Sequence, residues 1–227
     1  MPLTHDEVNA LFAEVSEEWN QAEEIVKAAE QICSEAVFPS IKEFRYAGRR
    51  LIDSFGEMAN GNDRAVIEGF VKDAVFNCHC ARHDAIDVAT ATIASNLEIV
   101  VSKIGYDIVL KAFPEFADLR RRLAEVRGKI RQSRVNRTDR NVIYQTIHNV
   151  DLPALASLYD QFQGAEDIMK SLASRERGER LFLRVTTVVA IIVAIVSATW
   201  PIFHKDEPGM VIPPGSTVIT PVVTPTQ

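Results

Sequence analysis

The sequence has few of the residues that interrupt helices and few of the patterns that form strands. Between residues 56 and 179 the only prolines are Pro114 and Pro153, so long helices can run through this part of the chain. No convincing run alternates apolar residues with polar β-formers, as the strands of a sheet with one buried face do. These absences argue against a sheet fold and predict an all-α protein.

Cysteine is also scarce, with three residues in 227, Cys33, Cys78 and Cys80. An odd number in helical surroundings argues against a disulfide framework and favours a reducing compartment. The first residues lack the basic segment followed by an apolar one that defines a cleavable signal peptide, so we expect none.

Motifs that would identify a reaction are missing. The sequence contains no P-loop, no GxGxxG, no GxSxG and no CxxC pair. Whether the protein is an enzyme is therefore uncertain; a non-enzymatic role is preferred, and no cofactor is expected.

Charge is distributed unevenly along the chain. Residues 1–110 hold 9 Lys or Arg and 19 Asp or Glu, a net charge of −10. Residues 111–184 hold 15 and 10, a net charge of +5, and the remainder contributes −1, giving −6 in total. Anionic lipid headgroups attract basic segments of this kind. The alternative is that these charges are solvated helix faces without a dedicated partner.

The longest apolar stretch, residues 185–203, reads VTTVVAIIVAIVSATWPIF and carries no charge. As a helix its 19 residues would extend about 28 Å, close to the roughly 30 Å hydrocarbon core of a bilayer. Arg175, Arg177, Arg180 and Arg184 precede it. By the positive-inside rule, the large N-terminal domain is then cytoplasmic in a single-pass protein of the cell membrane.

This stretch divides the chain into four parts. They are a cytoplasmic helical bundle (1–174), a basic juxtamembrane segment (175–184), a transmembrane helix (185–203) and a Pro/Thr-rich tail (204–227). A capping box at Thr4 and Glu7 starts a long amphipathic helix with a heptad-like, coiled-coil-type stripe. The helices expected in the bundle cover residues 4–36, 39–55, 64–103, 106–113, 114–134, 140–149 and 151 onward, with a loop at 56–62.

The densest group of ligand-type residues lies at 78–87. His79, His83 and Asp87 are four residues apart and share one helix face, a spacing at which two imidazoles can reach one zinc ion. The glutamate of an HExxH site is absent, so we predict no metal here. The favoured alternative is a polar seam in which these three side chains meet Arg45 or Arg49.

A second cluster is basic and lies between residues 120 and 140. Side chains this rich in positive charge suit the phosphates of RNA, a nucleotide or a lipid headgroup. The alternative is a solvated helix face, or one that pairs with the acidic first helix. The predicted phosphate- or anion-binding residues are Arg120, Arg121, Arg122, Arg127, Lys129, Arg131, Arg134 and Arg137.

One short segment resembles the motif of the HEPN ribonucleases, an Arg followed after four to six residues by a His, often with a polar residue beside the Arg. Here Arg140-Asn141 precedes His148, with seven residues between Arg and His. On an ideal helix the two side chains would differ in direction by about 80°. The resemblance implies catalytic roles for Arg140 and His148 in a membrane-tethered ribonuclease or nucleotide-binding protein.

Small residues recur every four positions in the apolar stretch, at Ala190, Ala194 and Ala198. This spacing lets helices approach closely in lipid and predicts a homo-oligomer, although a plain lipid-facing anchor fits equally well. The preferred function is an interaction or sensing module that assembles copies, or recruits a protein partner, at the membrane. A membrane effector of a bacterial stress or phage-defence system would have this layout.

Overall fold

The computed structural model describes residues 4–203, and within that range the chain is helical with no strand, which confirms the all-α prediction. The predicted tail at 204–227 and the side chain of Ala198 lie outside what the structure describes. The elements are α1 (His5–Cys33), α2 (Phe38–Ala59), α3 (Arg64–Ile104), α4 (Tyr106–Ala112), α5 (Phe116–Val135), α6 (Arg140–Thr146), the π-helical turn η1 (Ile147–Asp151), α7 (Leu152–Gly164) and α8 (Glu166–Phe203).

The ends of the first helices follow from local sequence. The Thr4 hydroxyl accepts from the Glu7 amide at 3.3 Å, and the Glu7 carboxylate accepts from the Thr4 amide at 2.9 Å, which confirms the capping box. The loop expected at 56–62 is shorter than predicted. The Asn60 amide still donates to the Gly56 carbonyl at 3.0 Å, and the helical path ends only at Gly61, where φ is +66°.

α6 and α7 are joined through η1 rather than separated at residue 150, where the sequence predicted a break. Pro153 lies in the first turn of α7. In a regular α-helix its ring would press on the carbonyl of Asn149, four residues earlier. The wider π-helical turn ends at Asp151, two residues before the proline, and contains Asn149; its greater width gives the Asn149 carbonyl room, so the helix continues without a break.

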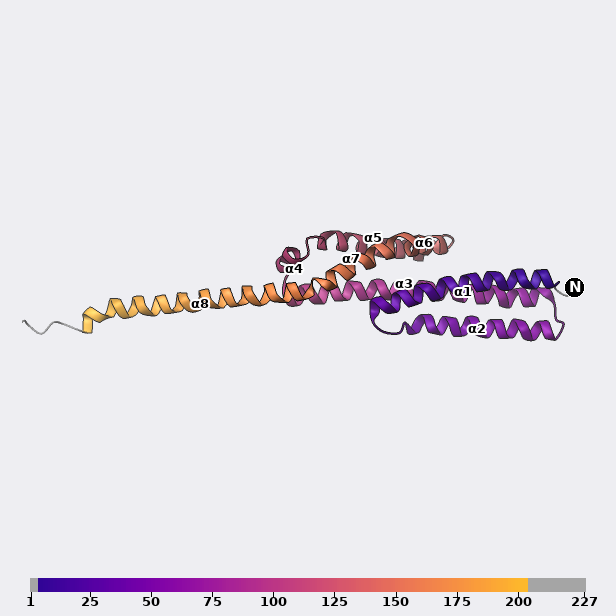
Figure 1. Cartoon of the computed structure of the whole chain (residues 1–227), viewed down its shortest axis with the longest axis horizontal. Helices are drawn as coiled ribbons and strands as arrows, with labels where there is room; N and C mark the ends of the chain where they lie inside the picture. The colour runs from indigo at the N-terminus through magenta and orange to yellow at the C-terminus, as the bar shows by residue number, and fades with distance from the viewer. Residues whose placement is uncertain (1–3, 204–227) are drawn as a thin grey trace, which may run out of the picture. The chain divides into compact units, whose positions relative to one another are not determined.

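α3 is the central helix of the first compact unit, which ends at Arg175. α1 and α2 run along the N-terminal part of α3, as Figure 1 shows. α5 packs against α6, α7 and α3, and α6 also packs against α3. The Asn96 side chain of α3 donates to the Tyr159 hydroxyl of α7 at 2.6 Å. Two groups of buried apolar side chains hold these contacts together, one centred on Ile86, Ile93 and Phe116 and a smaller one around Val71 and Cys78. α3 is therefore buried over a wide arc, as the central helix of a bundle is.

The second unit starts at Glu176, within α8. Two helices of the described range, α3 and Glu166–Ser197, are long and apolar enough to cross a membrane by length and composition. They differ in burial, because 39% of the apolar window of α3 is covered inside the protein and none of the window of α8 is. The burial of α3 is that of a core helix, whereas no described residue buries the apolar surface of α8.

Candidate functional site: an arginine-lined groove and a buried polar cluster

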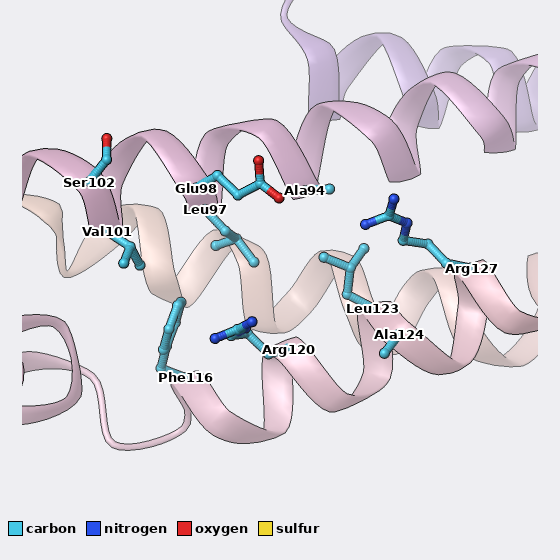
Figure 2. A pocket seen from close by; sticks show the side chains of 10 residues that line it. All are labelled: Ala94, Leu97, Glu98, Val101, Ser102, Phe116, Arg120, Leu123, Ala124 and Arg127. Atoms are coloured by element: carbon cyan, nitrogen blue, oxygen red, sulfur yellow. The ribbon is translucent and has the colours of Figure 1, made fainter. Parts of the chain in front are cut away.

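A groove of about 320 Å³ lies between α3 and α5 (Figure 2). Side chains from both helices converge on it, with Leu97 and Val101 on α3 facing Phe116 and Leu123 on α5. This apolar floor is bordered by polar groups at its rim. The complete lining is Ala94, Leu97, Glu98, Val101, Ser102, Phe116, Arg120, Leu123, Ala124 and Arg127.

Two arginines give this groove its charge. Arg120 and Arg127 are seven residues apart, so two turns of α5 place both guanidinium groups on the groove side, as Figure 2 shows. Neither forms an ion pair with a described residue, although Glu98 also lines the groove. An apolar floor with unpaired guanidinium groups at its edge suits a ligand that carries both an apolar part and an anionic group.

A second groove, of about 310 Å³, continues along the same two helices and shares Arg127 with the first. It adds Arg131 and Arg134. The two grooves together are therefore lined by four arginines of α5, at positions 120, 127, 131 and 134. The Arg134 guanidinium donates to Asp87 Oδ2 at 3.0 Å, which neutralises the far end of the row. The charge available to a ligand is therefore concentrated at Arg120, Arg127 and Arg131.

The other predicted anion-binding residues lie elsewhere on α5 or beyond it. Arg121 pairs with Asp118 and with Glu125, Arg122 pairs with Asp118, and Arg137 is exposed in the turn before α6. Lys129 donates to Asp151 at 2.6 Å. Basic residues of α5 thus pair with acidic residues of α5 itself, of α3 and of η1. None of these ion pairs involves α1, so they do not correspond to the alternative in which the basic cluster pairs with the acidic first helix.

A cluster of polar side chains is buried where α1, α3 and α6 meet, and Arg82 is at its centre. The Arg82 side chain is only 2% exposed. Its Nη1 donates to the Gln21 side-chain oxygen at 3.2 Å and to that of Gln145 at 3.3 Å, and lies 3.4 Å from Glu18 Oε2. Burial lowers the pKa of Arg82 from its ordinary value, and the nearby Glu18 carboxylate opposes this shift.

The three weak metal candidates do not converge on one point. His79 Nε2 is 2.9 Å from Glu18 Oε2, His83 stacks on Tyr144, and Asp87 accepts from Tyr144 and Arg134. Among the described residues, no group of three or more His, Cys, Asp or Glu side chains is placed to hold a metal ion.

The predicted polar seam exists, but its partners were wrongly expected on the second helix. Arg49 instead pairs with Asp53 on its own helix at 3.0 Å, and Arg45 lies over the ring of Tyr46. The reason is geometric. His79, His83 and Asp87 lie on the side of α3 that meets α1, α5 and α6, whereas α2 covers a different side.

His83 and Tyr144 form a buried stacked pair within this cluster, with ring centroids 4.0 Å apart. Burial, followed by the positive charges of Arg140 and Arg82, lowers the pKa of His83 to about 3, so its imidazole is neutral at pH 7. Burial and the bond to Asp87 raise the pKa of Tyr144 to about 12. Both rings are therefore uncharged in the folded protein at neutral pH.

Arg140 and His148, the pair suggested by the HEPN resemblance, lie in different surroundings. The Arg140 guanidinium lies over the Tyr144 ring, 5.8 Å from its centroid. His148 is in η1, half-buried, and its pKa is lowered by burial and by Arg82, while Glu24 raises it. No described contact joins the two side chains, and their catalytic roles stay a prediction.

Sequence reasoning overlooked Glu18, Arg82 and Tyr144 as members of one cluster. A signal existed for Arg82, since it follows Cys78 by four residues and so falls in line with the buried stripe of α3. A charged residue in such a stripe needs a buried partner. That the partner is Glu18, 64 positions earlier, depends on how α1 packs and is not visible in the local pattern.

Comparison with known proteins identifies no family for this chain. No family model matches the chain, and neither the curated proteins nor the solved structures contain a significant match.

Proposed function

We propose that this protein is a membrane-anchored helical interaction or sensing module. The observation that carries the proposal is the exposed apolar surface of α8. Eleven large apolar side chains between Leu181 and Val196 are each at least half exposed, on all sides of the helix. Arg184 is the only charged residue from 181 to 203.

Lipid is the surrounding that makes this surface favourable. Burying one large aliphatic side chain contributes about 1.5–3 kcal/mol, so a bare segment of this size in water carries a large penalty. The hydroxyl groups in the segment are already bonded within the helix. Thr186 donates to the Phe182 carbonyl at 3.0 Å and Thr187 to the Leu183 carbonyl at 2.7 Å, as polar groups in hydrocarbon need to.

The orientation and assembly belong to the same proposal. Arg175, Arg177 and Arg184 precede or open the apolar segment and favour a cytoplasmic bundle in a single-pass protein. Ala190 and Ala194, on successive turns, present a small face on which the α8 helices of two copies can approach closely.

The bundle offers two surfaces for interaction. One is the groove of α3 and α5, which we propose takes up an amphiphilic anion on Arg120 and Arg127. The other is a set of exposed apolar side chains on α2, where Phe38, Ile41 and Ile52 are 75%, 45% and 63% exposed and occupy heptad positions a, d and a, with Arg45 and Gly48 at the a and d positions between them. Together they support binding rather than catalysis as the role of the bundle.

Extraction of membranes at alkaline pH tests the anchor. We expect the full chain to stay in the membrane pellet and the double variant Ile192→Arg, Val193→Arg to be released, because each arginine at the centre of a span costs about 2.5 kcal/mol or more. The matched control carries two arginines on the bundle instead, Val66→Arg and Val135→Arg, and should stay in the pellet. Release of the unsubstituted chain would refute the proposal.

A further inference from the structure

A third groove, of about 400 Å³, opens over the buried polar cluster. Its floor is formed by Glu18, His79 and Arg82, and its sides belong to α6 and η1. The side residues are amides, one hydroxyl and two valines, namely Asn141, Val142, Gln145, Thr146, Asn149 and Val150. Its size is in the range of small-molecule sites, and it is separate from the arginine-lined groove, with which it shares no lining residue.

The charges in this floor compensate one another. Arg82 and Glu18 approach to 3.4 Å, and Glu18 also faces His79 at 2.9 Å. No further Lys or Arg lines the groove. A phosphate or carboxylate would thus meet no unpaired cation here, in contrast to the groove beside Arg120.

Hydrogen-bonding groups remain free for a neutral ligand. Gln145 uses its oxygen to accept from Arg82, which leaves its amide nitrogen as a donor. Asn141 uses its nitrogen toward His79 Nδ1, at 2.8 Å, and also interacts with His83, so its oxygen keeps one of its two lone pairs for a ligand. Arg82 Nε, buried with the rest of that side chain, has no partner among the described residues. A site with both donors and acceptors fits a ligand that has both on one edge.

The valines define the shape of that ligand. Val142 and Val150 line the groove with side chains that are 68% and 63% exposed. η1 places Val150 and Asn149 at the same groove as Val142 by widening the helix between them. Apolar groups beside amide edges match a flat ring whose faces are apolar and whose edge is polar.

We infer that this groove is a binding site for a neutral planar heterocycle of the nucleobase type, held at its edge by Gln145 and Asn141. The Gln145 nitrogen would donate to the polar edge of the ring and the Asn141 oxygen would accept from it, while the two valines contact its apolar face. Any ribose or phosphate would extend away from the groove without a charged contact.

Titration of the full chain in detergent with adenosine, guanosine, cytidine and uridine, followed by calorimetry, tests this inference. We expect at least one nucleoside to bind saturably, and its 5′-monophosphate to bind with an affinity within threefold. Absence of binding by all four nucleosides would overturn the inference. A monophosphate that binds more than tenfold tighter would also overturn it, since a cationic site would then be responsible.

Substitutions locate the site. Val150→Trp fills the groove from an exposed position and should weaken nucleoside binding at least tenfold, as should Gln145→Leu. Val135→Trp adds the same ring at a site 87% exposed and outside the groove, and should leave binding unchanged. If Gln145→Leu lowers the melting temperature, Val150→Trp alone decides the result. Equal binding by Val150→Trp and Val135→Trp would place the ligand elsewhere and refute the assignment.

Discussion

The phenol of Tyr144 donates a hydrogen bond to Asp87 Oδ1 at 2.7 Å, and thereby joins α6 to the central helix at a fully buried position. Asp87 is held on its other oxygen by Arg134 of α5, at 3.0 Å. One carboxylate thus connects three helices. This arrangement makes the bond between Tyr144 and Asp87 a test of the packing around α3.

Replacing this tyrosine measures that contact. We expect Tyr144→Phe to lower the free energy of unfolding by about 1–2 kcal/mol, since a part-buried hydrogen bond to a charged acceptor is lost. Denaturant titration of the full chain in detergent is the measurement. The control is Tyr106→Phe, whose ring is 43% exposed and packs edge-on against Phe116. An equal effect of both changes would argue against a special role for the buried bond.

The buried imidazole of His83 predicts a loss of stability in acid. Its pKa is about 3 in the folded protein and near 6.5 in the unfolded chain, so between these values the unfolded state binds more protons. Stability is therefore complete above pH 6.5 and falls as the pH decreases, by about 2 kcal/mol at pH 5 from this group alone.

His83→Phe keeps a ring against Tyr144 and removes the titrating group. We expect its free energy of unfolding to depend less on pH between 6.5 and 5 than that of the unsubstituted chain. Denaturant titrations at half-unit pH steps would show the difference. Parallel profiles for the two proteins would mean that His83 is accessible to protons in the folded state.

Local signals in the sequence were enough to predict most helices. The capping box at Thr4, the stripes of apolar residues and the proline near the start of α2 each act within a few residues. The end of α2 was predicted too early because Gly56 resembles a helix terminator, yet its carbonyl still accepts from Asn60. The residues that follow also hold this last turn, since the Gly61 amide donates to the Met58 carbonyl and the Asn62 amide to the Glu57 carbonyl, both at 3.1 Å.

The candidate sites were predictable in composition but not in arrangement. The basic character of α5 is evident from its sequence, whereas the selection of Arg120 and Arg127 for the groove depends on which side of α5 meets α3. The pairing of Glu18 with Arg82 needs α1 and α3 side by side. Each of these is a relation between helices, which single-helix periodicity does not contain.

The ribonuclease alternative predicts RNA cleavage that depends on Arg140 and His148. We expect no RNA cleavage by the full chain, because the two side chains have different neighbours. Arg140 lies over the Tyr144 ring and lowers the pKa of His83, whereas Glu24 and Arg82 are the charged groups that shift the pKa of His148. Incubation of the purified protein with labelled RNA is the measurement. Cleavage that disappears in both Arg140→Ala and His148→Ala, with melting temperatures unchanged, would show that the HEPN resemblance has functional meaning.

The arginine-lined groove predicts binding of amphiphilic anions, and 1-naphthyl phosphate is a soluble probe with both an apolar ring and a charged group. Its ring would contact the floor formed by Leu97 and Phe116, and its phosphate would accept from Arg120 and Arg127. We expect Arg120→Gln, Arg127→Gln to weaken binding at least tenfold, since the loss of two charge-assisted hydrogen bonds amounts to about 1.4 kcal/mol or more.

The chain offers a matched control for this experiment. Arg121→Gln, Arg122→Gln removes the same charge from the same helix, but these side chains pair with Asp118 and Glu125 and do not line the groove. Binding in the control should therefore stay within about twofold of the unsubstituted chain at 0.15 M salt, where the Debye length is about 8 Å. If both double variants lose affinity equally, the attraction is a property of the total charge of α5. If only the Arg120 and Arg127 pair matters, the groove between α3 and α5 is the binding site.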